Sequence, residues 1–312
     1  MIFNPKTLQI FNPPIYNEDE TECLEIGYFT NDRKQIQISQ FPNTIQKVPK
    51  ELPKFITSLE NAFRDNKNSK IEGIETWDVS NVKDMSSMFS WAENFNQDIS
   101  KWNTSNVTNM SWMFSWAYKF NQPIGSWNTS NVKDMHSMFD GAKSFNQDIS
   151  NWDTWEVIDM SEMFGGAKSF NQNISNWDTS KVENMSTMFH GAEKFNQDIS
   201  KWDVSKVKDM SWMFREASSF NQPIGAWDTS DVRDMSGMFE EAESFNQPIG
   251  DWDVSKVEDM SYMFSKALSF NQDISKWDVS KVENMEFMFD GATSFDEENY
   301  SPKFNSTKKL TL

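Results

Sequence analysis

The sequence contains a single cysteine, Cys23, and only two histidines, His136 and His190. One cysteine cannot form an intramolecular disulfide, and no cysteine or histidine stands at the spacing of a zinc site. Phosphate-binding loops, zinc-protease motifs and nucleophile motifs are also missing. These absences argue against disulfide-stapled, metal-dependent and nucleotide-dependent classes of protein. We therefore expect no cofactor, no metal site and no enzymatic activity.

Long apolar runs are absent as well, and none approaches the roughly 20 residues that a transmembrane helix needs. The start of the chain, MIFNPKTLQIFNPPIYNEDE, lacks the charged region and the apolar region of a signal peptide. As written, the chain is therefore expected to have no transmembrane segment and to be cytoplasmic.

Basic residues are in the minority, with 29 Lys and Arg against 47 Asp and Glu and a net charge of −18. Residues 1–73 carry nine basic and ten acidic groups and residues 299–312 carry three basic groups, so the flanks sum to +2 and the middle holds −20. An acidic surface repels phosphate backbones and anionic lipids. We expect no nucleic-acid or anionic-membrane partner. We also expect a monomer, because like charge opposes end-to-end association.

The sequence contains instead a 25-residue repeat that occurs nine times in tandem between Ile74 and Glu298. A typical copy is ISKWNTSNVTNMSWMFSWAYKFNQP, residues 99–123, and no copy contains an insertion or a deletion. A fixed period of this kind is typical of solenoids, in which each unit buries its apolar face only against its neighbours. The sequence therefore predicts one nine-repeat solenoid over residues 74–298.

The copies agree at their apolar positions. Eight apolar residues recur unchanged in every copy, and in the first copy they are Ile74, Trp77, Val82, Met85, Met88, Phe89, Ala92 and Phe95. These positions hold 18 of the 19 Met and 9 of the 14 Trp, which would be wasteful on a surface. They predict the core of the stack rather than a stripe that binds a ligand.

The spacing within a copy predicts its local structure. Met85, Met88, Phe89 and Ala92 stand at i, i+3, i+4 and i+7, which is the face of a two-turn amphipathic helix. The Asp or Asn before the first Met, Asp84 in the first copy, is what a helix N-cap requires. Four copies place a glycine at the expected helix end, namely Gly141, Gly166, Gly191 and Gly291. The Ile and Trp that open each copy indicate a short strand, so each unit is predicted to be α/β.

The flanks have their own organisation. Residues 22–40 predict a β-hairpin inside an N-terminal segment, 1–48. Residues 49–73 contain a degenerate copy of the repeat, here called the worn copy. A solenoid needs such a terminal unit to cover the apolar side chains of its first full repeat. The aligned pairs are Ile56 with Val82, Leu59 with Met85, and Phe63 with Phe89. Residues 299–312 lose the pattern and are expected to form a C-terminal tail or cap.

The motif MFxxAxxFNQ(D/P)I(S/G)xWD(T/V)SxV resembles the repeat of the BspA-like leucine-rich-repeat family, in particular its mycoplasma branch of surface lipoproteins of unknown function. The order GYFTNDRKQIQISQF, KVPKELPKFITSLENAF and WDVSNVKDMSSMF is similar to that branch, so the resemblance covers about Glu22 to Glu298. It implies a right-handed leucine-rich-repeat stack with short parallel strands, and a cell-surface role in adhesion or host interaction. It implies no catalytic residues. Cys23 follows the acidic run NEDETE rather than an apolar segment, so it is not a lipobox cysteine.

The positions where the copies disagree are the better source of function. Aromatic residues occur irregularly at positions expected on the outer side of the predicted helix. The predicted partner-binding residues are Trp91, Trp112, Trp116 and Tyr118, with Trp112 and Trp116 as an i, i+4 pair. Alternatively, these rings pack across neighbouring helices or onto the cap. The regular Asp rows suggest weak calcium binding, although turn formation explains them more simply.

These observations favour a non-enzymatic binding or adhesion module that presents an extended surface to a protein or glycan partner. The alternative is a structural spacer, or an antigenically variable surface element, without a specific ligand. A glycan-acting enzyme has the least support, because the carboxylates recur with the repeat and no acid pair stands out.

Overall fold

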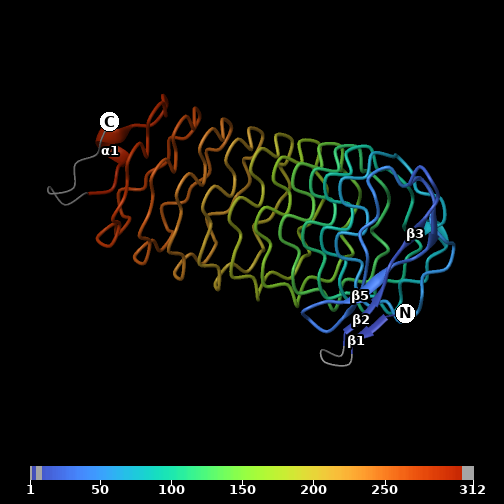
Figure 1. The fold of residues 1–312 in the computed structure, drawn as a ribbon. Helices are drawn as coiled ribbons and strands as arrows, with labels where there is room; N and C mark the ends of the chain where they lie inside the picture. The colour runs from blue at the N-terminus through green and yellow to red at the C-terminus, as the bar shows by residue number, and fades with distance from the viewer. Residues whose placement is uncertain (1, 5–8, 304–312) are drawn as a thin grey trace. The chain divides into compact units, whose positions relative to one another are not determined.

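The computed structural model describes residues 2–4 and 9–303, with side chains from Phe11 onward. The chain divides into two compact units, residues 1–153 and residues 154–312. Within each unit the chain winds in successive coils that lie side by side (Figure 1). No helix in the described ranges has the length and apolar character that a membrane crossing requires.

The first unit begins with two small antiparallel sheets. Four strands form one sheet in the order β1-β2-β5-β6, namely β1 (Ile2–Asn4), β2 (Gln9–Asn12), β5 (Tyr28–Thr30) and β6 (Ile36–Ile38). The other sheet pairs β3 (Ile15–Tyr16) with β4 (Cys23–Glu25). A tight turn joins β5 to β6, in which the Asn31 N–H donates to the Gln35 carbonyl at 3.0 Å. Ile38 at the end of β6 is fully buried and contributes to the core.

The predicted α/β repeat is wrong, because the copies form neither the expected helix nor the expected strand. Among the described residues the helical elements are a 3-10 turn, η1 (Ile74–Thr76), and one short helix, α1 (Glu297–Tyr300). The Asp296 carboxylate caps α1 by accepting the Asn299 N–H at 3.2 Å. The helix-bearing leucine-rich-repeat solenoid implied by the resemblance is therefore not the fold of this chain.

A run of turns replaces the helix in each copy. Alternate N–H groups leave the coil and donate to the next one, at 2.7–3.0 Å: Met85 to Asn109, Ser87 to Ser111, Phe89 to Met113, and Trp91 to Ser115. The intervening groups close turns within the coil, as from Met88 N–H to the Met85 carbonyl at 3.3 Å. Ser87 and Trp91 have φ values of 55° and 62°. An α-helix needs negative φ throughout and i to i−4 bonds, so this segment cannot be one.

The Asp or Asn expected as an N-cap links coils instead. Asp84 Oδ1 accepts the Ser86 N–H at 3.0 Å, which is a local Asx turn. Single parallel bridges join this position from coil to coil within each unit. They run along Ser58, Asp84, Asn109 and Asp134 in the first unit, and along Asp159, Asn184, Asp209, Asp234, Asp259 and Asn284 in the second.

The predicted core positions are buried, which confirms that part of the interpretation. In the second unit Phe189 is completely buried and its ring lies 3.9 Å from that of Phe195, centroid to centroid. The indole of Trp202 is buried too, and its Nε1–H donates to the Ile174 carbonyl at 3.1 Å. The same indole-to-carbonyl bond recurs in other copies. It explains why the Ile and Trp keep a fixed spacing.

The repeated Asn-Gln dipeptide forms a side-chain ladder along the stack. Asn196 Oδ1 accepts the Asn221 N–H at 2.9 Å and the Gln222 Nε2–H at 2.8 Å. Each Asn thus satisfies the backbone of the next coil, and each Gln reaches back to the Asn before it. The ladder accounts for the polar pair beside the hydrophobic core in the first eight copies, which the ninth copy replaces with Asp296 and Glu297.

Residues 49–73 take the same course as the full copies. Phe63 is completely buried and stacks on Phe89 with 5.5 Å between ring centroids. Asn61 and Asp65 have positive φ values, as Ser87 and Trp91 do at the equivalent positions of the first full copy. The stack also reaches further back, because Phe41 stacks on Phe63 at 4.8 Å. Parallel bridges join Glu22 to Lys47 and Lys47 to Glu72.

The positive φ values predict a measurable backbone strain in the second unit. Gly191 has φ +63°, and an added Cβ would lie 3.7 Å from Gly166 Cα, an ordinary contact. Gly191→Ala should therefore lower the free energy of unfolding by roughly 1 kcal/mol through the backbone alone. Glu216 has φ 56° at the equivalent position, so Glu216→Gly should raise it by a similar amount. Urea unfolding of both variants measures these changes. The change in the free energy of unfolding must be negative for Gly191→Ala and positive for Glu216→Gly.

Candidate functional site

Two positions in each copy hold the backbone in the left-handed region and carry the irregular side chains. The first left-handed position holds Ser87, Trp112, Ser137, Glu162, Thr187, Trp212, Gly237, Tyr262 and Phe287. The second left-handed position holds Trp91, Trp116, Gly141, Gly166, Gly191, Glu216, Glu241, Lys266 and Gly291. Glycine at these positions therefore avoids the steric cost of positive φ in a turn, and its assignment to a helix end is wrong. Most of the other side chains are half-buried, Trp91 and Lys266 are exposed, and Ser137 is buried.

Trp91 and Trp116 form the centre of an aromatic surface in the first unit. Their ring centroids lie 4.8 Å apart and the rings are nearly parallel, with 4° between the planes. Trp116 also lies close to Gly141, where an added Cβ would be 3.1 Å from its Cδ2 atom. Trp116 is thus enclosed on both faces, whereas Trp91 is 39% exposed. Among the described residues, no other ring or cation lies over Trp91.

Tyr118 extends this surface on the other side of Trp116. The two rings meet edge to face, with centroids 5.9 Å apart. The Lys143 Nζ lies 4.2 Å from the centroid of the Tyr118 ring. Trp91, Trp116 and Tyr118 therefore form a continuous row that ends in a cation held over an aromatic face.

Trp112 makes a separate contact, with the His136 ring edge to face and 5.5 Å between centroids. Its Nε1–H donates to His136 Nε2, and His136 Nδ1 lies 2.6 Å from Asp134 Oδ1. This assigns the imidazole proton to Nδ1, where it is donated to the carboxylate. The predicted i, i+4 pairing of Trp112 with Trp116 is wrong, because it required a helix. We use "aromatic surface" for Trp91, Trp112, Trp116 and Tyr118, which all lie in the first unit.

The second unit holds an aromatic column that was not among the predicted site residues. Trp212 lies over Gly237, where an added Cβ would be 2.1 Å from Trp212 Cε3. Its ring centroid is 6.2 Å from that of Tyr262, which lies 5.1 Å from that of Phe287. The Arg215 guanidinium lies 5.3 Å from the Trp212 ring. The missed signal is that glycine occupies the first left-handed position only in the copy after Trp212.

The regular carboxylates have a structural explanation. Asp198 Oδ1 accepts the Ser200 N–H at 2.9 Å. Hydrogen bonds from the Ser200 hydroxyl and then its N–H hold the pKa of the Asp198 carboxyl below its usual value. Asp98 with Ser100 repeats the arrangement. Across residues 2–4 and 9–303, no group of three or more His, Cys, Asp or Glu has the geometry to hold a metal ion.

Cys23 is a buried thiol in β4 rather than a reactive one. Its Sγ–H donates to the Glu25 carbonyl at 3.2 Å. Burial raises the pKa of the thiol to about 11, with the backbone bond opposing and the Glu25 charge adding. Since the thiolate is the nucleophile, Cys23 is protonated and inert at neutral pH.

Comparison with known proteins places the chain at the level of a family. The model of the family described as "Mycoplasma protein of unknown function, DUF285" matches residues 57–164, 147–233 and 221–311. A search of the curated proteins finds no match. The resemblance to mycoplasma repeat proteins is confirmed at this level, and the BspA-like leucine-rich-repeat name is not. Because the three tandem matches span most of the chain, this repeat protein belongs to the mycoplasma DUF285 family.

Proposed function

We propose that the chain is a non-enzymatic binding or adhesion module that engages a protein or glycan partner through the aromatic surface. The observation that supports this most is the presence of Trp91, Trp112 and Trp116 at left-handed positions. Each bulky residue costs roughly 1–2 kcal/mol there relative to a right-handed conformation. Four copies avoid that cost with glycine at the second left-handed position, and one copy does so with Gly237 at the first. Backbone strain that persists in this way is common at binding sites.

The geometry of the surface suits recognition. The Trp91–Trp116 stack is ordered before a partner arrives, so little side-chain entropy is lost on binding. The half-exposed Trp91 offers a flat apolar area of the kind found at interface hot spots. An aromatic side chain of a protein or the C–H face of a sugar ring could continue the stack. Lys143 adds a polar contact at the other end of the row.

Replacing Trp91 and Trp116 together with alanine should weaken partner binding at least tenfold, because hot-spot tryptophans contribute 2 kcal/mol or more. The same change should lower the free energy of unfolding only by roughly 1–2 kcal/mol, since one stacked pair is lost at the surface. Glycan and protein arrays screened with the wild-type chain identify the probe. Titration calorimetry and thermal unfolding then measure both quantities on each variant.

Trp155→Ala provides the matched control, because Trp155 is 48% exposed and lies outside the aromatic surface. It should leave binding of the array probe unchanged. Equal binding by the Trp91/Trp116 variant would contradict the proposal. Failure of the wild-type chain to bind any probe would favour the structural-spacer or variable-surface interpretation instead.

A further inference from the structure

A second candidate site lies at the N-terminal sheet of the first unit and shares no residue with the aromatic surface. It is an open pocket of about 730 Å³. The residues that line it are Phe11, Phe29, Thr30, Asn31, Asp32, Arg33, Gln37 and Glu60. None of them belongs to a full copy of the repeat. Stacking of the nine copies therefore does not dictate their identity.

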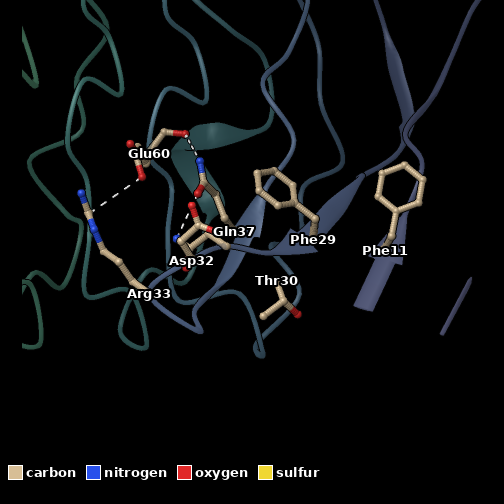
Figure 2. Close-up of a pocket in the computed structure, with 8 residues that line it drawn as sticks. Phe11, Phe29, Thr30, Asp32, Arg33, Gln37 and Glu60 are labelled. Carbon is tan, nitrogen blue, oxygen red and sulfur yellow. Dashed lines mark hydrogen bonds and ion pairs between the residues drawn. The ribbon is translucent and has the colours of Figure 1, made fainter. Parts of the chain in front are cut away.

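One wall of the pocket is aromatic. Phe11 on β2 and Phe29 on β5 are directly paired across the two strands, so their side chains lie on the same face of the sheet. Figure 2 shows the Phe29 ring between the Phe11 ring on one side and Gln37 on the other. Phe11 is 45% exposed. An exposed phenyl ring in a concave site is typical of a surface that takes up an apolar group.

The polar part of the pocket continues from the aromatic part, because Gln37 on β6 is directly paired with Phe29 and lies on the same face of the sheet. Gln37 is buried, and its Nε2–H donates to the Glu60 carbonyl at 3.2 Å. Its Oε1 accepts the Asn31 Nδ2–H at 3.0 Å. Arg33 Nη1 lies 3.9 Å from Glu60 Oε2 (Figure 2). The same nitrogen contacts Asp84 more closely. The Gln37 bond fixes the Glu60 backbone next to the residue that follows Phe29 across the sheet.

The charges of the pocket do not cancel. Arg33 is offset by the buried Asp84, which leaves the carboxylates of Asp32 and Glu60 in excess. Burial raises the pKa of the Glu60 carboxyl, the charge of Asp84 adds to this, and Arg33 opposes it. A carboxylate in this position gains from a further cation. An anionic ligand would meet two carboxylates, while Arg33 is already paired.

We propose that this pocket binds an organic cation, an ammonium or guanidinium group carried on an apolar body. The apolar body lies along Phe11 and Phe29, and the cation lies past Phe29, over Gln37 and toward the Glu60 carboxylate. Cations are attracted to the faces of aromatic rings and form strong hydrogen bonds with carboxylates. A small amine and the basic side chain of a peptide share this chemistry.

The test is a calorimetric titration of the full-length chain with benzylammonium and with its neutral analogue, benzyl alcohol. Benzylammonium should bind at least tenfold more tightly, and benzoate more weakly than either. Glu60→Gln, which keeps the shape of the side chain, should reduce the preference for the cation severalfold or more. Glu51→Gln is the matched control, because Glu51 is exposed and outside the pocket, and it should change nothing.

Two further variants separate the aromatic part of the pocket from its charged part. Phe11→Ala should weaken the binding of benzylammonium and of benzyl alcohol by similar factors, because it removes an apolar contact that both ligands make. Asp32→Asn alters only an exposed side chain and should weaken the binding of benzylammonium but not that of benzyl alcohol. This variant keeps the proposal testable if Glu60→Gln misfolds. A capped arginine tripeptide that binds more tightly than benzylammonium would identify a peptide as the source of the cation. Equal binding of benzylammonium and benzyl alcohol to the wild-type chain would overturn the proposal.

Discussion

Replacing Phe189 with alanine should lower the free energy of unfolding by about 3–5 kcal/mol, the usual cost of removing a buried aromatic ring. Phe189 has no exposed surface. Its ring lies 3.9 Å from Phe195 and 5.7 Å from each of Phe164 and Phe214. The cavity would therefore form between neighbouring coils whose spacing is fixed by backbone hydrogen bonds from one coil to the next, as from Phe189 N–H to the Met213 carbonyl at 2.9 Å, so the coils cannot close on it.

Urea unfolding followed by circular dichroism measures this loss, and Phe287→Ala is the control. Phe287 is a half-buried ring in the same unit, at the first left-handed position, and stacks on Tyr262 at 5.1 Å. Its removal should cost roughly 1 kcal/mol, the value of a surface aromatic pair. Similar losses for the two variants would show that the constant phenylalanines are not the main source of stability.

The core of this protein could be predicted from the sequence because stacking repeats one environment. A position such as Met88 or Phe89 meets its own equivalents in neighbouring coils, so the same residue suits every copy. Comparison of copies inside one chain therefore separates core from surface. The worn copy at residues 49–73 could be aligned for the same reason, since Phe63 continues the column of Phe89.

The local structure could not be predicted from the same spacing. An i, i+3, i+4, i+7 pattern places four side chains on one side of a helix, but also on one side of a chain of turns. Hydrogen bonds to the next coil decide between them, and these depend on tertiary contacts. The informative signal was the second left-handed position, where glycine alternates with Trp, Glu or Lys, as at Gly191 and Glu216. Both are left-handed turns.

The candidate sites could be predicted only where the repeat is broken. Irregular tryptophans drew attention to Trp91, Trp112 and Trp116, although only the structure shows that Trp91 rather than Trp112 stacks on Trp116. The N-terminal pocket gave no signal at all. Phe11 and Phe29 are unremarkable in sequence, and they meet only because β2 and β5 pair in that register.

Deleting residues 1–73 should cause aggregation or lower the free energy of unfolding by several kcal/mol. Burial of a large apolar side chain contributes about 1.5–3 kcal/mol, and the deletion would uncover Met85, Met88 and Phe89 together. It would also remove the N–H groups of the worn copy that bind the first full copy at 2.8–3.1 Å: Leu59 to Asp84, Asn61 to Ser86, Phe63 to Met88, and Asp65 to Ser90. An open edge of unpaired carbonyl groups beside apolar side chains favours association between chains.

Two point variants of the full-length chain distinguish the loss of apolar contacts made by the worn copy from the effect of shortening the chain. Phe63→Ala removes a fully buried ring from the worn copy and should cost about 3–5 kcal/mol. Phe55→Ala removes a ring that is 49% exposed in the same segment, and should cost about 1 kcal/mol. Light scattering and thermal unfolding report aggregation and stability for all three changes. If the shortened chain stays monodisperse with an unchanged melting temperature, residues 49–73 do not cap the stack, because the exposed faces of Met88 and Phe89 would then cost nothing in water.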